Sequence, residues 1–423
     1  MIGAKINLDG ESLPDGWSVQ LVGDMGEYIN GYPFKPTEWK EQGLPIIRIQ
    51  NLNDAAKPFN YFHDRIDERY LVRDGDILIS WSASLGTFLW RRGDAWLNQH
   101  IFKALPDETK IDRSFFYWAM VYAIDRIAKN ARGSTMMHVT GKEFKDSEIL
   151  LPSRVEQRKI AGVLGLVQRA IEQQERLIAL TTELKKALLH QFFTQGFRGE
   201  PQKQTEIGPV PESWKMVELG SLAKVGNGST PKRDNEGYWQ GGTIPWLNSA
   251  KIHERFIAEA DQFVTDLAVK ECHLPRVKPG SLLVAITGQG KTLGNTALVF
   301  FETCINQHLA YAQFTTPRVV PEFVLWFMQT RYDHLRSISQ AGGSTKGALT
   351  CGYLKTYPVP VPALDEQHEI AAVFAALDWK EKVHQRKHTA LTALFCTLLH
   401  QLMTAQIRIH ALDLPELGNS IEV

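Results

Sequence analysis

The chain has 423 residues, of which 43% are hydrophobic and 22% charged, and its 47 basic side chains balance 47 acidic ones. This composition is typical of a globular protein with more than one domain, and it excludes a disordered tail or a strongly basic packaging protein. Apolar runs such as 282–286 and 297–301 are far shorter than the ~18 residues of a membrane-spanning helix, and residues 1–10 lack a signal-peptide core. We therefore expect a cytoplasmic protein.

The second half of the chain repeats the first, with sequence markers that keep their order. The matched segments, in chain order, are 13–17 (LPDGW) with 210–214 (VPESW), 74–79 with 279–284, Asn98-Gln99-His100 with Asn306-Gln307-His308, and 133–135 (GST) with 343–345 (GST). The shift between partners grows from 197 to 210 residues along this series. The upstream parts of the two copies therefore differ by insertions, as loops do.

From the Gly-Ser-Thr segments onward the shift stays at 210 residues. The matched pairs are Glu156-Gln157 with Glu366-Gln367, Ile160-Ala161 with Ile370-Ala371, and 188–191 (LLHQ) with 398–401 (LLHQ). A stretch without insertions is typical of a rigid helix. Each half is predicted to be a variable globular domain followed by a helix of fixed length.

The first globular domain is predicted over residues 1–152 and the first long helix over 153–196. Ser153 and Glu156 have capping-box spacing, and no proline follows before Gly196, which is a good helix stop. Apolar residues recur at spacings of three and four along this segment, as in a coiled coil or a helical hairpin.

The second globular domain is predicted over 197–362 and the second long helix over 363–406, although residues 380–388 are polar and weaken its pattern. A core helix of an unrelated domain would explain either segment alone, but two at identical internal spacing favour antiparallel pairing. The expected fold is α+β, with two similar domains separated by a coiled coil and related by a pseudo-twofold axis. We expect the tail, 407–423, to pack near the first domain.

These features resemble the specificity subunit of type I restriction–modification systems, over essentially the whole chain. The resemblance rests on the LPDGW and VPESW openings, the Glu-Gln and Ile-Ala pairs, the LLHQ helices and the Gly-Ser-Thr segment before each helix. It implies two mixed α/β target-recognition domains, each reading one half of a bipartite double-stranded DNA target. It also implies that the paired helices set the spacing and dock two modification (methyltransferase) subunits, and that restriction subunits can join the complex.

The resemblance further implies that this chain is not itself an enzyme. Adenine methylation and DNA cleavage would belong to partner subunits, which would also bind S-adenosylmethionine, ATP and Mg, whereas this chain would bind no cofactor. The residues agree, because the sequence contains no Asn-Pro-Pro-Tyr string and no HExxH pair, and its four cysteines lack CxxC spacing. Residues 106–110 (PDETK) resemble a nuclease carboxylate motif, but their acidic groups are too crowded for a metal site, so a solvated loop is the better explanation.

An alternative enzyme reading comes from Ala285–Thr292, which resembles a phosphate-binding loop with Lys291 as its lysine. The first glycine is missing, and the residues that follow, 293–300, indicate a strand where a phosphate loop requires a helix. We therefore expect a β-hairpin here. A self-sufficient DNA methyltransferase and a scaffold that binds only proteins remain alternatives to the DNA-reading subunit.

Neither globular domain is strongly basic, so phosphate contacts must be local. The candidates are two basic clusters and the Gly-Ser-Thr hydroxyls: Arg126, Lys129, Arg132, His138 and Lys142; Lys224, Lys232 and Arg233; Ser134, Thr135, Ser344 and Thr345. Ordinary solvated faces and satisfied turns are the alternative. Residues shared by both halves cannot make their half-sites differ, so the repeated Asn-Gln-His is expected to position or to contact the DNA backbone.

Base-edge contacts should come from polar loop residues that the two halves do not share. The candidates are Arg48, Gln50, Asn51, Arg91 and Arg92 in the first half, against Asn248, Lys251, Gln289, Lys291 and Lys346 in the second. Trp81 and Trp246 are candidates for contact with thymine methyls or, alternatively, for the core.

Overall fold

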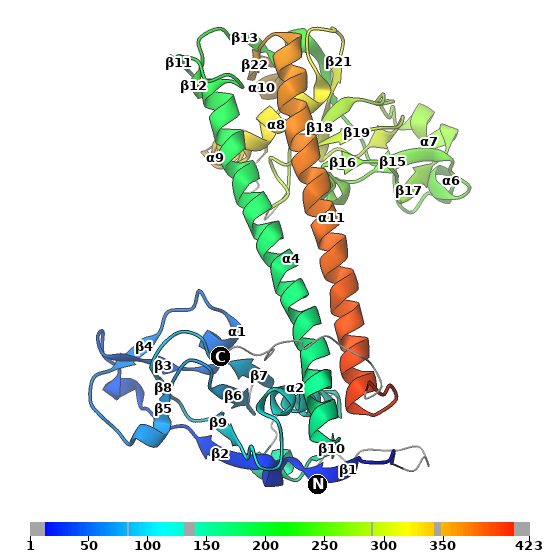
Figure 1. Cartoon of the computed structure of the whole chain (residues 1–423). Coiled ribbons are helices and arrows are strands. Elements are labelled where there is room, and N and C mark those ends of the chain that lie inside the picture. The colour runs from blue at the N-terminus through cyan, green and yellow to red at the C-terminus, as the bar shows by residue number, and fades with distance from the viewer. Residues whose placement is uncertain (1–12, 83, 131–139, 289–290, 342–347, 410–423) are drawn as a thin grey trace. The chain divides into compact units, whose positions relative to one another are not determined.

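The computed structural model describes residues 13–82, 84–130, 140–288, 291–341 and 348–409. The chain divides into two compact units: unit 1 is Met1–Glu175 with Gln385–Val423, and unit 2 is Arg176–His384. Both boundaries fall inside long helices, α4 (Arg154–Gln195) and α11 (Leu364–Met403). Each unit therefore contains one globular domain and about half of each long helix (Figure 1). The two predicted long helices are confirmed, with ends within three residues of those expected.

Among the described residues, the globular domain of unit 1 contains three sheets and, besides the long helices, three α-helices. An antiparallel sheet has the order β2 (Gly26–Asn30), β9 (Ile101–Pro106), β6 (Ile77–Ser80), β7 (Gly86–Leu89). A mixed sheet has the order β4 (Asn60–Phe62), β3 (Leu44–Ile47), β8 (Ala95–Leu97), β5 (Leu71–Val72). The remaining elements are the pair β1 (Ser18–Leu21) and β10 (Glu148–Leu151) and the helices α1 (Ile49–Asn53), α2 (Arg113–Asn130) and α3 (Gly141–Lys145).

Unit 2 repeats this plan with additions. Its larger sheet has the order β14 (Ala223–Asn227), β21 (Leu309–Phe314), β18 (Ser281–Ala285), β19 (Thr296–Val299), β16 (Phe256–Ile257). Its smaller sheet has the order β17 (Gln262–Val264), β15 (Ile244–Leu247), β20 (Cys304–Ile305). Two pairs complete the strands: β11 (Gln202–Thr205) with β12 (Gly208–Pro211), and β13 (Lys215–Glu218) with β22 (Pro358–Val361). The helices are α5 (Leu219–Leu222), α6 (Glu236–Trp239), α7 (Asp266–Glu271), α8 (Pro321–Thr330), α9 (Tyr332–Ala341) and α10 (Cys351–Thr356).

The strand registers show that the two domains share one topology. In both units a parallel pair joins the smaller sheet: β3 with β8 in unit 1, and β15 with β20 in unit 2. In both units four strands of the larger sheet pair antiparallel in the same order, β2-β9-β6-β7 and β14-β21-β18-β19, and unit 2 adds β16 parallel to β19. The expected similarity of the two domains is therefore confirmed.

Each domain completes its core with one end of each long helix. In unit 1 the buried residues Ile160 and Leu164 of α4 join Leu402 and Met403 of α11 in the core around α2. In unit 2 the equivalent positions are Ile370 and Phe374 of α11 with Phe192 and Phe193 of α4. The two helices thus exchange roles between the units, as an internal duplication requires.

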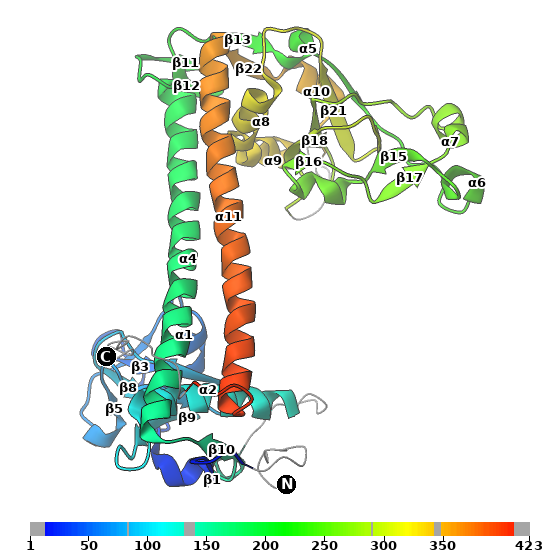
Figure 2. The same cartoon turned by 45° about the vertical axis from the view of Figure 1, so that its right-hand side comes forward.

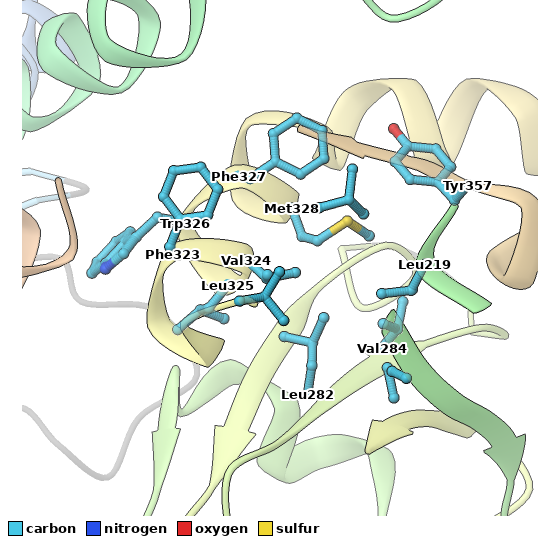
Figure 3. Packing of buried hydrophobic residues seen from close by; sticks show 14 of the residues in the cluster. Leu219, Leu282, Val284, Phe323, Val324, Leu325, Trp326, Phe327, Met328 and Tyr357 are labelled. Atoms are coloured by element: carbon cyan, nitrogen blue, oxygen red, sulfur yellow. The ribbon is translucent and has the colours of Figure 1, made fainter. Parts of the chain in front are cut away.

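Helix α8 is the centre of the unit 2 core, because all six side chains from Phe323 to Met328 are buried. Figure 3 shows Leu282 and Val284 of β18 on one side of this helix and Tyr357 near its end. Its Phe323 also packs against Phe193 of α4, with ring centroids 5.3 Å apart. Burying an apolar side chain contributes roughly 1.5–3 kcal/mol, so this layer is a main source of the unit's stability.

In each unit the two long helices lie side by side and run antiparallel (Figure 2). In unit 1, His388 Nε2 lies 3.1 Å from Glu175 Oε1, and in unit 2, Lys185 Nζ lies 3.0 Å from Asp378 Oδ1. Lys185 lies ten residues after Glu175 along α4, whereas its partner Asp378 lies ten residues before His388 along α11. The two helices therefore run in opposite directions. Helix α11 continues without a break through residues 380–388, the polar stretch that weakened its predicted pattern.

Charged groups replace apolar packing at one level of the unit 2 helix pair. The ammonium of Lys185, which is 11% exposed, contacts Asp378 and Glu381, and Asp378 also accepts a hydrogen bond from Arg255 of the recognition domain. At a shift of 210, unit 1 has Phe395, Gln168 and Ile171 at the positions of Lys185, Asp378 and Glu381. The duplication is therefore broken at this level of the helix pair, where unit 1 has uncharged side chains at the positions of the three ionic groups.

The repeated Glu-Gln pair fastens each domain to the first turn of the helix that follows it. In unit 1, the Trp17 indole N–H donates to Glu156 (Nε1–Oε2 3.1 Å), and the backbone N–H of Asp112 donates to Gln157 Oε1 at 2.7 Å. In unit 2, Trp214 donates to Glu366 at 3.1 Å, and the backbone N–H of Val320 donates to Gln367 Oε1 at 2.8 Å. We call each set the Glu-Gln latch. It explains why the tryptophan and the Glu-Gln pair recur together in the sequence.

Residues just after α11 close on the latch of unit 1. The guanidinium of Arg408 donates to both carboxylate oxygens of Glu156, with Nε–Oε1 2.7 Å and Nη2–Oε2 2.9 Å. Ile409 is buried in the same core. The Glu156 side chain is 2% exposed, so this is a buried, bidentate ion pair, and it joins the end of the second helix to the start of the first.

The latch predicts a specific loss of stability. Replacing Glu156 with alanine should lower the free energy of unfolding of unit 1 by about 2–3 kcal/mol, because the Trp17 indole and the Arg408 guanidinium both lose a buried acceptor. Urea denaturation followed by near-ultraviolet circular dichroism measures this change. Glu172→Ala, at an exposed position on the same helix, is the matched control and should change stability by less than about 0.5 kcal/mol. Equal stability of the two variants would show that the latch does not stabilise the unit.

Candidate nucleic-acid interface

The repeated Asn-Gln-His segment is a turn that links the two sheets of each domain. In unit 1 it connects β8 to β9, and the backbone N–H of Gln99 donates to Tyr32 O at 3.0 Å. In unit 2 it connects β20 to β21, and the backbone N–H of Asn306 donates to Leu247 O at 2.9 Å. The segment therefore holds the corner between the larger and the smaller sheet, which is the architectural role that its repetition indicates.

A glycine permits the close approach of the chain to this corner. A Cβ on Gly31 would lie 2.1 Å from the carbonyl oxygen of Asn98, and a Cβ on Gly228 would lie 1.8 Å from that of Ile305. Both distances are far below van der Waals contact and involve backbone atoms. Any other residue at these positions would push the turn away from the end of β2 or β14.

A cleft of about 480 Å³ opens beside the turn of unit 1. It is lined by residues from the turn, from the end of β3 and from the segment before β3: Asn98, Gln99, His100, Arg48, Ile49, Gln50, Phe34, Pro36 and Trp39. The structure thus brings the shared Asn-Gln-His together with two residues that the sequence predicts as base readers, Arg48 and Gln50. The arginine and the amide groups in its lining can donate and accept hydrogen bonds as base edges require.

The corresponding surface of unit 2 has the same turn with different neighbours. Gln307 accepts a hydrogen bond from the hydroxyl of Thr230, and His308 Nδ1 shares a hydrogen bond with the hydroxyl of Thr287. In unit 1, His100 instead packs against the edge of Trp81, with ring centroids 5.2 Å apart. The Asn-Gln-His turn is therefore shared by the two units, while the side chains around it differ.

Two predicted base readers are corrected by the structure. Asn51 has 0% exposed surface, and its amide donates to the carbonyl oxygens of Lys57 and Pro58, so it stabilises a loop and cannot reach a base. Lys251 is 9% exposed and contacts Glu254 at 2.8 Å and Asp261 at 3.0 Å. Hydrogen bonds to Glu254 and then to Asp261 raise the pKa of Lys251, so its charge is already compensated within the unit.

The other predicted base readers lie on or near turns. Arg91 and Arg92 are exposed directly after β7, and the Arg92 guanidinium lies 5.4 Å from the Trp90 ring. Asn248 is half-buried and caps a short 3-10 helix through the backbone N–H of Ala250, and Trp246 is 2% exposed, in agreement with its alternative assignment to the core. Gln289 and Lys346 lie outside the described residues.

Lys291 is exposed in the connection between β18 and β19. These two strands pair antiparallel, so the segment after Lys291 leads into a strand and no helix begins there. The predicted hairpin is confirmed, and nucleotide hydrolysis through a phosphate-binding loop is not supported by this geometry.

The first basic cluster is only partly within the described residues. Arg126 is half-buried against Tyr122 and donates to the backbone oxygen of Glu148, and desolvation lowers the pKa of its guanidinium. Lys129 is exposed and forms an ion pair with Asp125 at 2.6 Å, which raises its pKa, and Lys142 is exposed on α3. The members that lie outside the described residues are Arg132, Ser134, Thr135 and His138, and the same is true of Ser344 and Thr345 in unit 2.

The second basic cluster is divided between two places. Lys224 is exposed on β14, and Lys232 and Arg233 are exposed in the connection from β14 to α6. Arg233 differs from its neighbours because its guanidinium is fixed, at 3.9 Å from the centroid of Trp239. DNA contact by the exposed members of both clusters stays a prediction.

Sequence reasoning missed Trp39 and Trp239, which carry arginines in the two units. Each tryptophan stands five residues before the first strand of the smaller sheet, at Leu44 or Ile244. The two segments match at a shift of 200, which falls between the shifts of 197 and 205 that flank them. A search for matches at intermediate shifts would have found them.

Two segments of the chain, residues 14–182 and 211–393, match the family described as the type I restriction modification DNA specificity domain. Together they cover most of the chain, which therefore belongs to this family. The chain is 22% identical over 430 residues to the type I restriction enzyme MjaVIII specificity subunit of Methanocaldococcus jannaschii, with 96% of each chain covered. It is 23% identical to the type I restriction enzyme EcoBI specificity subunit of Escherichia coli, over 88% of this chain and 82% of that relative.

The fold is also that of a solved structure. The S subunit of a type I restriction–modification system from M. genitalium matches with a TM-score of 0.59 and 16% sequence identity, over 93% of this chain and 98% of that chain. The duplicated fold, the repeated latch and the two matched segments thus place the chain among type I specificity subunits, as its sequence motifs predicted. Specificity subunits act on DNA and assemble with other subunits, and the chain shares that class.

The glycines at the corner predict a defect that is local to each unit. Gly31→Ala should destabilise unit 1 and Gly228→Ala unit 2, each by about 2 kcal/mol or more, because the added methyl group would overlap a backbone carbonyl. Gly352→Ala is the matched control, since its Cβ would meet only Thr350 Oγ1 at 3.7 Å. Thermal unfolding measures the change. A Gly31→Ala chain as stable as the control would contradict the close packing of the turn.

Proposed function

We propose that this chain is the DNA-reading subunit of a type I restriction–modification complex. Each recognition domain reads one half of a bipartite double-stranded DNA target, while α4 and α11 fix the spacing of the two halves and bind methyltransferase subunits. The observation that carries the proposal is the duplication of one domain topology, with each copy fixed by its Glu-Gln latch to the first turn of the long helix that follows it.

The division between shared and unshared residues supports a split target. The latch, the sheets and the Asn-Gln-His turn recur in both units, so they cannot distinguish one DNA sequence from another. The residues after the equivalent strands β3 and β15 differ: Arg48 and Gln50 occupy the positions that Asn248 and Ala250 occupy in unit 2. Two domains with the same backbone structure but different polar side chains would read two different short DNA sequences.

The exposed apolar side chains of the long helices support docking of two partner subunits. Leu184 on α4 is 49% exposed, and Leu394 on α11, its equivalent at a shift of 210, is 46% exposed. Trp379 on α11 is 68% exposed. Large apolar side chains exposed at equivalent places on a duplicated helix pair are typical of a protein interface that occurs twice. We infer that each position contacts one methyltransferase subunit, and that restriction subunits join the resulting complex.

The chemistry would belong to these partners. Among the described residues, no group of three or more His, Cys, Asp or Glu could hold a metal ion, and no helix is long and apolar enough to cross a bilayer. We propose that S-adenosylmethionine, ATP and Mg bind to the partner subunits and that this chain binds no cofactor. We also propose that the complex acts in the cytoplasm, where its DNA substrate lies.

Selection from random duplex DNA tests the reading of a split target. The full chain, alone and with its methyltransferase subunits, is expected to enrich two specified blocks separated by a stretch of fixed length and free sequence. Sequencing of the bound DNA measures the enrichment. An uninterrupted motif would contradict the assignment of one block to each domain, and no enrichment in either sample would favour the protein-binding scaffold. The chain alone should neither transfer methyl groups to DNA nor hydrolyse ATP.

A pair of equivalent substitutions tests the docking surface. Leu184→Glu and Leu394→Glu should each remove one methyltransferase subunit from the complex, and the double variant should remove both, because a carboxylate would be desolvated in an apolar contact. Analytical ultracentrifugation of the mixed subunits measures the stoichiometry. Thr182→Glu and Thr392→Glu are matched controls, since both threonines are exposed, equivalent at a shift of 210 and bonded only to the preceding helical turn. Unchanged stoichiometry in the double variant would place the interface elsewhere.

A further inference from the structure

Each recognition domain holds an arginine over the ring of an equivalent tryptophan. The Arg48 guanidinium carbon lies 4.9 Å from the centroid of Trp39, and that of Arg233 lies 3.9 Å from the centroid of Trp239. Trp39 and Trp239 occupy the same place in their units, five residues before β3 and β15. The aromatic platform is therefore part of the shared frame.

A carboxamide at an equivalent register position fixes each guanidinium from a second direction. Arg48 Nη1 donates to Asn60 Oδ1 at 3.0 Å, and Arg233 Nη2 donates to Gln262 Oε1 at 2.8 Å. Asn60 stands opposite Ile46 in the β3–β4 pair, and Gln262 stands opposite Trp246 in the β15–β17 pair. Because residues 46 and 246 are themselves equivalent, the two amides are at the same place. We call this ring and amide the arginine cradle.

The two arginines reach the cradle from different positions in the sequence. Arg48 directly follows β3, whereas Arg233 precedes α6, and the second unit has Asn248 at the position of Arg48. If the two arginines were only a remnant of the duplication, they would stand at equivalent sequence positions in the two units. The place of the guanidinium is retained although its source in the chain has changed, which indicates a function for the charged group itself.

The cradle leaves the guanidinium available to a ligand. Among the described residues, neither Arg48 nor Arg233 has an ion pair with a carboxylate, whereas Arg276 of unit 2 contacts both Asp266 and Glu302. Arg48 lines the cleft beside Gln99 and His100. Arg233 also lies 4.9 Å from the Trp246 ring, whose indole donates to Ser229 O beside the Asn-Gln-His turn of unit 2.

A fixed guanidinium is suited to a planar acceptor edge. Arginine is the most frequent reader of guanine, because two of its N–H groups match the O6 and N7 acceptors of that base. The contact with the tryptophan ring and the hydrogen bond to the carboxamide restrict the guanidinium before binding, which reduces the entropy cost of a two-bond contact. A phosphate can also be bound by a mobile lysine point charge, which requires no cradle.

We propose that Arg48 and Arg233 are counterparts, each donating to O6 and N7 of one guanine at the same place within its half-site. This inference rests on the proposed DNA-reading function and assigns Arg233, which the sequence placed among phosphate contacts, to base recognition. The unshared residues near each cradle would then determine the bases that flank the guanine.

Random-duplex selection with full-length variants tests the proposal. Arg48→Ala should lower the preference for guanine at one position of one half-site by about 10- to 100-fold, and Arg233→Ala should do the same in the other half-site. Arg48→Lys and Arg233→Lys keep the charge without the two-bond fork, so they should also lose the preference while retaining the salt dependence of binding. Arg69→Ala, which removes an arginine stacked on Tyr70, and Arg276→Ala are controls that should leave the selected sequence unchanged.

Moving the arginine tests the equivalence of the two cradles. In the Arg233→Ala background, Asn248→Arg supplies a guanidinium from the position that unit 1 uses, and it should restore guanine at the same position of the half-site. Absence of guanine, or guanine at another position, would overturn the equivalence.

The outcomes separate the two proposals. Alanine variants that weaken binding to all sequences alike, with a shallower salt dependence, would show phosphate contacts and overturn the guanine assignment. If the Arg48 and Arg233 variants altered the base preference in the same half-site, the guanine assignment would also be overturned. If the unaltered chain and its methyltransferase complex select no split motif, the proposed function itself fails, independently of the arginines.

Discussion

The architecture depends on the burial of long-helix side chains in the cores of the recognition domains. Ile160 and Leu164 of α4 complete one core with Leu402 of α11, and Phe374 of α11 completes the other with Phe193 of α4. These contacts are apolar and well buried, so they stabilise the attachment of each domain to the helices. The Glu-Gln latches fix the orientation of each domain through hydrogen bonds of defined geometry. Each domain is therefore incomplete without both helices.

The fold was largely predictable because the duplication separates two kinds of segment. An insertion in a helix that packs on both sides would disrupt its contacts. The matched residues of the two long helices therefore stay at a constant shift, whereas the loops of the two domains differ in length. The polar stretch of α11 was harder to interpret. Glu381 of this stretch and Asp378 just before it contact Lys185 across the helix pair. A pattern of apolar spacing cannot show such pairing, because the paired residues are far apart in the chain.

The candidate site was predictable only in part. Comparison of the two halves identified Arg48 and Gln50 as unshared polar residues, and the structure places both in the cleft beside the shared turn. The same comparison selected Asn51, which is buried, because sequence difference alone does not report exposure. It also could not relate Arg48 to Arg233, since residues at unmatched positions meet equivalent partners only once the chain is folded.

The pairing of β1 with β10 brings the two ends of the first recognition domain together, since Ser18 stands opposite Leu151. β13 and β22 do the same for the second, with Lys215 opposite Val361. The two ends of each domain thus lie at one place, next to the domain's own latch. A reading module built in this way is replaceable: a foreign module with the same tryptophan and strand ends could be inserted there by recombination, giving a new target without redesign of the scaffold.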